Sequence, residues 1–237
     1  MRYCSWIHMP KETFFNLPEE KRSGFLSVAY REFALHDYDT ASISRIVSEL
    51  GIAKGSMYQY FADKRALYEY LLEQAAAEKL SHLAETVGSG TDGAPGEERE
   101  DFFELQTGMM LAGARFDLAY PDRSLLMYRA MQEPAGPERA SLAEELTRQS
   151  AEFIRGYLAG AAERGEIRSD IEIELAAHVV NTLSLALEPY LKMKYGYSHL
   201  QQLVDDRENL PFTEEELEED IRNMVSIMKA GLQRRSQ

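Results

Sequence analysis

Apolar positions repeat with helical spacing along most of the chain. Phe25, Ala29 and Phe33 follow one another at intervals of four residues, so they share one face of a helix. Asn16 can cap the start of this helix, with Glu19 three residues later. No stretch alternates between apolar and polar residues as a strand would. The sequence therefore predicts an all-α protein.

A short helix pair is expected next. The first helix, over about 42–50, has apolar residues at the positions i, i+3, i+4 and i+7: Ile43, Ile46, Val47 and Leu50. Gly51 follows, and glycine commonly ends helices in the left-handed conformation. A further helix is expected to start near Lys54, and a long one to run over about 64–87.

The C-terminal two thirds of the chain is predicted to hold five more helices. The Gly-rich segment "GSGTDGAPGEERE" over 88–100 is the clearest predicted loop. Helical periodicity then indicates the ranges 99–117, 122–132, 137–165, 171–195 and 213–233. Residues 195–212 are expected to form a long connection that is either partly helical or mobile.

The stretch "GIAKGSMYQYFADKRAL" over 51–67 has an unusual distribution of aromatic residues. On a helix, Met57 and Phe61 point to one side, Gln59 points to the opposite side, and Tyr58 and Tyr60 flank it. The outer face offers a small residue, a hydroxyl and an amide. Two short helices joined by a Gly turn form a helix-turn-helix, whose second helix lies in the DNA major groove. The alternative interpretation is a plain helical hairpin in the protein core.

The charge distribution favours a DNA-binding head. The 237 residues have a net charge of −14, which by itself opposes binding to nucleic acid. Residues 1–72, however, contain nine basic and nine acidic residues, and the segment 42–65 has a local charge of +2. The negative charge therefore belongs to the rest of the chain.

Composition excludes several other classes. Hydrophobic residues make up 44% and charged residues 28%, as in soluble globular proteins. Cys4 is the single cysteine, so we expect neither a disulfide framework nor a Cys/His zinc site, and a reducing cytoplasm fits. The N-terminus lacks the apolar segment of a signal peptide. The most apolar stretch contains Glu188 and two other polar residues, which favours a buried helix over a membrane span.

Residues 14–70 resemble the DNA-binding domain of the TetR family of bacterial transcriptional regulators. The resemblance is carried by Phe33, Ile46, Gly51, Ile52, Lys54, Gly55, Ser56, Tyr58, Gln59, Tyr60, Phe61, Lys64 and Leu67. It implies an N-terminal extension over 1–13, a helix-turn-helix domain over 14–70, and an α-helical effector-binding and dimerisation domain over 71–237. Ala53 departs from the family pattern, in which many members have a capping Ser or Thr. Loss of such a cap costs about 1 kcal/mol of helix stability.

The resemblance also implies the DNA-binding residues. Base and near-base contacts would be made by Ser44, Arg45, Gly55, Ser56 and Gln59. Phosphate contacts would be made by Lys54, Tyr58, Tyr60 and Lys64. The expected function is a ligand-responsive repressor that binds a palindromic site on double-stranded DNA.

For residues 71–237, the resemblance implies dimerisation and effector binding. In the family, helices at the positions of 171–195 and 213–233 form the two-fold interface of a homodimer, although their apolar faces could serve only the core of one chain. A soft apolar set is expected to line a cavity for a small, mostly apolar effector: Phe102, Met109, Met110, Phe116, Met127, Tyr128, Met131 and Tyr157. His178 or Asn181 would orient the ligand. The alternative is that all these residues form an ordinary core.

An enzyme is the main competing class. The sequence contains no G-x-S-x-G, H-E-x-x-H, P-loop or paired cysteines. We therefore assign no catalytic residue and expect no cofactor. A helical enzyme or a protein-interaction module without DNA binding remains the alternative, but an interaction module does not explain the pattern from Tyr58 to Lys64.

Overall fold

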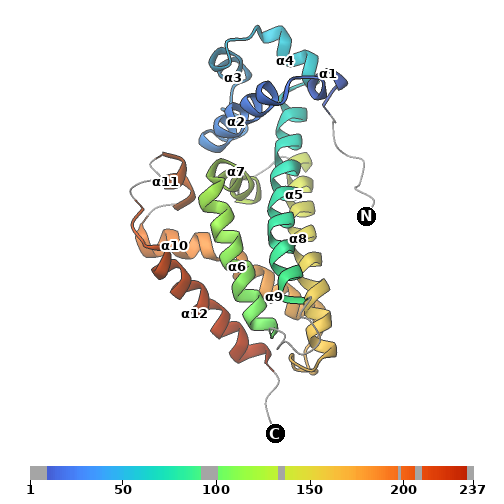
Figure 1. Cartoon of the computed structure of the whole chain (residues 1–237), viewed down its shortest axis with the longest axis vertical. Helices are drawn as coiled ribbons and strands as arrows, with labels where there is room; N and C mark the ends of the chain where they lie inside the picture. Colours follow the sequence, from blue (N-terminus) through green and yellow to red (C-terminus); the bar gives the residue numbers. More distant parts are fainter. Residues whose placement is uncertain (1–9, 92–100, 133–136, 197–198, 206–209, 234–237) are drawn as a thin grey trace. The chain divides into compact units, whose positions relative to one another are not determined.

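The computed structural model describes residues 10–91, 101–132, 137–196, 199–205 and 210–233, and the predicted all-α class is confirmed (Figure 1). The helices are α1 (Glu12–Phe15), α2 (Glu19–Leu35), α3 (Ile43–Glu49), α4 (Lys54–Tyr60), α5 (Lys64–Thr91), α6 (Phe102–Ala119), α7 (Pro121–Gln132), α8 (Pro137–Glu163), α9 (Ile173–Leu185), α10 (Leu187–Tyr195), α11 (His199–Asp205) and α12 (Glu214–Leu232). Within the described ranges, no helix is both long and apolar enough to cross a membrane.

The chain forms two compact units. The first comprises Met1–Glu78 and Tyr120–Leu142, and the second comprises Lys79–Ala119 and Ala143–Gln237. Helices α5 and α8 each contribute residues to both units.

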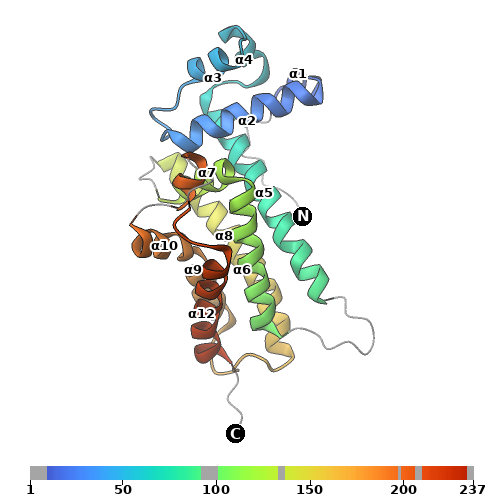
Figure 2. The same cartoon turned by 60° about the vertical axis from the view of Figure 1, so that its left-hand side comes forward.

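In the first unit, α2 lies between α3 and α7 (Figure 2). Arg123 of α7 contributes to the α2–α7 contact, because its guanidinium lies 4.7 Å from the ring centre of Tyr30 on α2. It also lies 4.8 Å from the ring centre of Tyr120, which directly precedes α7. The same group forms an ion pair of 2.7 Å with Glu78 of α5. Helix α7 therefore packs against α2, an arrangement that the sequence pattern did not indicate.

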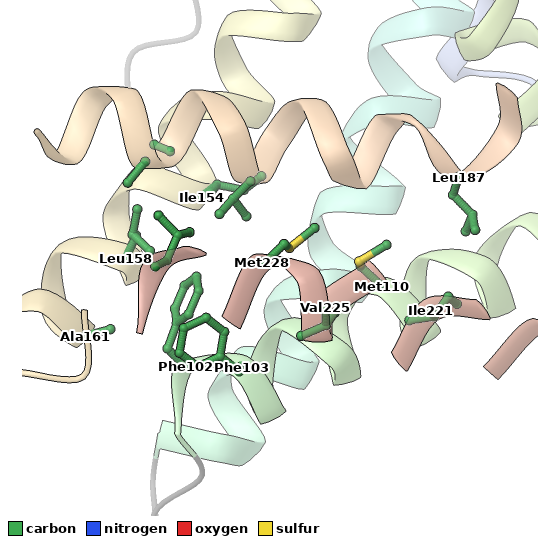
Figure 3. Packing of buried hydrophobic residues seen from close by; sticks show 14 of the residues in the cluster. Phe102, Phe103, Met110, Ile154, Leu158, Ala161, Leu187, Ile221, Val225 and Met228 are labelled. Atoms are coloured by element: carbon green, nitrogen blue, oxygen red, sulfur yellow. The ribbon is translucent and has the colours of Figure 1, made fainter. Parts of the chain in front are cut away.

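In the second unit, α6 packs along α12, and α9 contacts both α10 and α12. Their shared core is apolar (Figure 3). Its members come from α6, α8, the turn after α8, α9, α10, the segment before α12 and α12 itself, and they include Phe102, Phe103, Met110, Leu158, Ile167, Val180, Leu191, Phe212, Ile221, Val225 and Met228. Burial of these apolar side chains stabilises this unit.

The predicted helix over 171–195 is wrong in one respect, because it is two helices. Helix α9 ends at Leu185, Ala186 has the φ/ψ values of a turn (−76° and −6°), and α10 begins at Leu187. Pro189 explains the break. It has no N–H to donate to residue 185, and its ring clashes with the carbonyl of that residue.

The start of the first long helix also differs from the prediction. Asn16 does not cap it. Asn16 instead ends the extra short helix α1, and α2 begins at Glu19 after Pro18. The predicted loop over 88–100 begins later than expected, since α5 continues to Thr91; residues 92–100 lie outside the described residues. The predicted partly helical connection is confirmed by α11.

Candidate nucleic-acid interface

The candidate interface is built on α3 and α4. Ser42 caps α3 by accepting a hydrogen bond from the Arg45 N–H at 3.4 Å. Gly51 has a φ of 65°, the left-handed value expected for the turn between the helices. The turn is closed by the N–H of Ile52, which donates to the Val47 carbonyl at 3.0 Å. This geometry is the predicted helix-turn-helix.

Helix α4 has the predicted inner and outer faces. Met57 and Phe61 are fully buried, and Gln59 is exposed on the opposite side. Lys54 and Gly55 are exposed as well, and Ser56 is half-buried. The outer face therefore presents the side chains that the family resemblance assigns to DNA.

Gly55 is not required by the packing of the protein. A Cβ atom there would meet no neighbouring atom within 4 Å, and the backbone does not have a positive φ. Glycine favours the helix less than alanine does, so packing and helix propensity both give no reason for it here. A small residue at this exposed point leaves room for the close approach of another molecule.

The two tyrosines of α4 have different surroundings. The Tyr58 side chain is 44% exposed. The ring of Tyr60 is half-buried and packs against Phe14 and Phe25, with centroid distances of 6.0 and 5.9 Å. Tyr58 is therefore the more available of the two for a surface contact.

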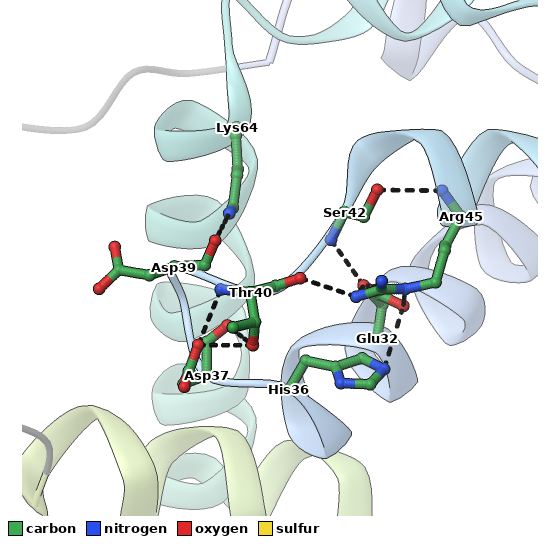
Figure 4. Close-up of polar contacts among 8 residues, drawn as sticks. All are labelled: Glu32, His36, Asp37, Asp39, Thr40, Ser42, Arg45 and Lys64. Carbon is green, nitrogen blue, oxygen red and sulfur yellow. Dashed lines mark hydrogen bonds and ion pairs between the residues drawn. The ribbon is translucent and has the colours of Figure 1, made fainter.

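The guanidinium of Arg45 is bonded to other residues of the chain, although its side chain is half exposed (Figure 4). Its Nε and Nη2 donate to the Oε1 of Glu32 at 2.9 and 2.6 Å, and Nη2 also donates to the Thr40 carbonyl at 2.8 Å. The hydrogen bonds to Glu32 raise the pKa of the guanidinium. Glu32 is 9% exposed and also accepts the N–H of Ser42 at 2.6 Å. This acid joins the end of α2 to the start of α3.

Glu32 was missed by the sequence analysis, although a signal for it exists. It lies three residues after Ala29 and directly before Phe33, so it falls beside the buried face of α2. An acid in such a position requires a hydrogen-bonding or cationic partner. Arg45 is that partner.

Lys64 supports the segment between α2 and α3. Its ammonium donates to the Asp39 carbonyl at 3.3 Å and lies 4.7 Å from the centre of the Tyr38 ring. Burial lowers the pKa of this ammonium. Asp37 holds the same segment by accepting from the N–H and hydroxyl of Thr40 at 2.7 and 2.6 Å.

The residues of the predicted effector site are divided between the units. Phe102, Met109, Met110 and Phe116 of α6 are buried in the second unit, together with Asn181 of α9. Tyr157 of α8 stacks on Phe102 with a centroid distance of 5.4 Å. Met127, Tyr128 and Met131 lie on α7 in the first unit. His178 is exposed on α9.

A line of polar groups crosses the apolar part of the second unit. The Tyr157 hydroxyl donates to Gln106 Oε1, and Gln106 Nε2 donates to the Ser184 hydroxyl at 3.0 Å. Gln106 is 2% exposed, and burial raises the pKa of Tyr157. Nearby along α9, Asn181 accepts from the Ser150 hydroxyl at 2.7 Å. Gln106 was not predicted, because a single amide within a helix has no distinctive spacing.

Comparisons with known proteins agree with this geometry. A family model described as "Bacterial regulatory proteins, tetR family" matches residues 25–71. The HTH-type transcriptional repressor AcnR of Corynebacterium efficiens is 27% identical over 158 residues, which cover 67% of this chain and 74% of AcnR. The HTH-type transcriptional repressor KstR2 of Rhodococcus jostii is 24% identical over 157 residues, covering 66% of this chain and 72% of KstR2.

Solved structures extend the likeness over nearly the whole chain. The crystal structure of a TetR family transcriptional regulator from Chloroflexus aurantiacus has a TM-score of 0.72 and 30% identity, with 96% of this chain and 100% of that chain covered. The ketosteroid transcriptional regulator KstR2 of Mycobacterium tuberculosis, at 17% identity, shares the fold with a TM-score of 0.61 over 92% of this chain and 98% of that chain.

Proposed function

The chain belongs to the TetR family of DNA-binding bacterial transcriptional regulators, and from this premise we propose that it is a repressor. It binds a palindromic operator as a homodimer, and a small, mostly apolar effector releases it from the DNA. The observation that carries the proposal is the outer face of α4. It offers Lys54, Gly55 and Gln59 to a partner, while Met57 and Phe61 fix the helix from inside.

The proposed roles follow the chemistry of each side chain. Gln59 can form a bidentate pair with adenine, and Ser44, Gly55 and Ser56 lie at or near base edges. Lys54, Tyr58, Tyr60 and Lys64 would bind phosphate oxygens. Arg45 is bonded to Glu32 and Thr40, which favours a role in holding α3 over the base contact that the family resemblance implies.

Exposed apolar side chains support the homodimer. On α9, Leu175 is 56% exposed and Val179 is 37% exposed, whereas Ala176 and Val180 on the adjacent face are buried. On α12, Ile227 is 69% exposed. Apolar residues gathered on the outer face of a helix are typical of a subunit interface. The dimer would bury these side chains through α9 and α12.

The second unit supports the proposed effector site. The buried Met and aromatic side chains of α6 adjoin the polar line of Gln106, Tyr157 and Ser184, and this combination suits an apolar ligand with one or two polar groups. Asn181 is the better candidate for orienting such a ligand, because it is 3% exposed and His178 is exposed.

The test is enrichment of duplexes from a random pool by the wild-type protein, followed by binding measurements over a range of salt concentrations. A dimer with two symmetric heads should enrich an inverted repeat. Phosphate contacts from both heads should make the affinity fall steeply as salt increases. Enrichment of no inverted repeat would contradict the proposal.

A further inference from the structure

The C-terminal end of α4 is held by residues that precede the helix-turn-helix. The last four carbonyls of any helix have no partner within that helix. In α4 these belong to Met57, Tyr58, Gln59 and Tyr60, and the Phe61 N–H satisfies the first of them at 3.0 Å. The partners of the other three all come from the chain around α1.

Lys11 and Thr13 supply these partners. The Lys11 ammonium donates to the Tyr58 carbonyl at 2.7 Å, and the Lys11 N–H donates to the Tyr60 carbonyl at 2.8 Å. The Thr13 hydroxyl donates to the Gln59 carbonyl. A cation at this end of a helix is also favoured by the helix dipole.

Phe14 fixes this segment to the rest of the first unit. Its side chain is fully buried, and its ring lies 5.0 Å from that of Phe61, 5.6 Å from that of Phe25 and 5.9 Å from that of Tyr70. The ring therefore contacts α2, the end of α4 and α5 together. Lys11 and Thr13 are held in place by this neighbouring anchor.

Helix α4 needs such support. It has seven residues, fewer than the roughly 12–15 at which isolated helices become even marginally stable in water. Its N-cap, Ala53, makes no side-chain hydrogen bond. Contacts outside the helix must therefore determine its exact position and its rigidity.

We propose that Lys11, Thr13 and Phe14, here called the N-terminal clamp, are positioning residues for DNA recognition. The clamp fixes the backbone of Tyr58, Gln59 and Tyr60, so it sets how these side chains meet the duplex without reading a base itself. This inference rests on the proposed DNA-binding function. The clamp lies outside residues 25–71, which the family model matches.

The experiment uses two matched pairs of variants in the full chain. Thr13→Val removes the hydroxyl and preserves the shape of the side chain, whereas Thr13→Ser preserves the hydroxyl. Lys11→Met removes the ammonium, whereas Lys11→Arg preserves a cationic donor. Both positions are exposed, so all four variants should fold.

The first measurement is hydrogen exchange of the amides from Tyr58 to Phe61 without DNA. Thr13→Val should speed their exchange about two- to tenfold, as expected for loss of one hydrogen bond, and Thr13→Ser should not. Exchange in α2 should stay unchanged in both. Equal exchange in the two variants would overturn the clamp.

The second measurement is binding to the inverted repeat enriched by the wild type and to the same duplex with scrambled half-sites. Thr13→Val and Lys11→Met should reduce the ratio of these two affinities by about two- to tenfold. Thr13→Ser and Lys11→Arg should keep the wild-type ratio. The salt dependence should not change. A salt slope lowered by about one per protomer in Lys11→Met would instead identify Lys11 as a phosphate contact and overturn its positioning role.

The two measurements separate the two proposals. If the wild type enriches no duplex, the proposed function fails and the recognition role of the clamp fails with it, whatever the exchange data show. If the wild type enriches a duplex and Thr13→Val leaves the affinity ratio unchanged, only the positioning role is overturned.

Discussion

The guanidinium of Arg45 on α3 lies against the carboxylate of Glu32 on α2, with Nη2 2.6 Å from Oε1. Glu32 is 9% exposed, so the pair places a nearly buried negative charge within a head that binds polyanionic DNA. The carboxylate accepts from both Arg45 and the Ser42 N–H, and this satisfies its oxygens where water has little access. The pair fixes the α2–α3 corner and therefore the direction of α3.

The first prediction concerns this pair. Glu32→Gln should lower the free energy of unfolding by about 1–3 kcal/mol, because it leaves Arg45 without its anionic partner. Arg45→Met should cost a similar amount. If the two side chains act through each other, the double variant should cost less than the sum of the single variants. Urea unfolding followed by circular dichroism measures this, and additive effects would contradict a coupled pair.

The second prediction separates base reading from phosphate binding. Gln59→Ala should relax the preference at one base position per half-site, at a cost of about 1–3 kcal/mol. Lys64→Ala should weaken binding to all duplexes alike and lower the salt slope. Binding to a panel of single-base operator variants distinguishes the two effects. A changed sequence preference in Lys64→Ala with none in Gln59→Ala would reverse the assignment.

The third prediction concerns the homodimer. The isolated chain should tolerate a charge at Ile227 or Val179, because both side chains are exposed there. In the dimer the same charge would be buried at the interface with no opposite charge beside it. Ile227→Glu and Val179→Glu should therefore sediment as folded monomers with weak operator binding. Ile221→Glu is the matched control. Ile221 is fully buried within the chain, so this variant should unfold.

Sedimentation of the wild-type protein tests the premise of the third prediction, which is that the protein is a dimer. We expect a dimer at micromolar concentration. A wild-type monomer, or an Ile227→Glu variant that remains dimeric, would exclude α9 and α12 as the interface.

The fourth prediction concerns the effector. A lipophilic compound that binds the protein should raise its melting temperature and release the operator, with a coupling no larger than its difference in affinity for the two states. Met109→Trp should reduce the response by filling space in the second unit, where Met109 is 5% exposed. Met127→Trp makes the same change on α7 in the first unit and shows whether α7 also contributes. Unchanged responses in both variants would exclude these residues from the site.

Local patterns were sufficient to predict the helix-turn-helix. The inward position of Met57, the outward position of Gln59 and the left-handed Gly51 all follow from the spacing and type of adjacent residues. The same local reasoning could have found the break before Leu187, since Pro189 is visible in the sequence.

Other features depend on contacts between distant residues. The packing of α7 on α2 rests on Arg123 and Tyr30, which are far apart in the chain and carry no shared motif. The bonds from Lys11 and Thr13 cross 47 and 46 residues and end on backbone carbonyls, which are the same in every residue type. Because every residue has a backbone carbonyl, the sequence does not indicate which carbonyl a distant side chain will bind.

The three carbonyl bonds at the end of α4 bear on how this regulator can be recombined with others. A chimera joined at residue 25, where the family match begins, would replace Lys11 and Thr13 and would separate the recognition helix from its donors. The transplanted helix would retain its side chains and lose the contacts that define its end. A head that is to keep its operator preference in a new protein must therefore include Lys11 and Thr13, so the exchangeable module of this protein is larger than the segment that the family model matches.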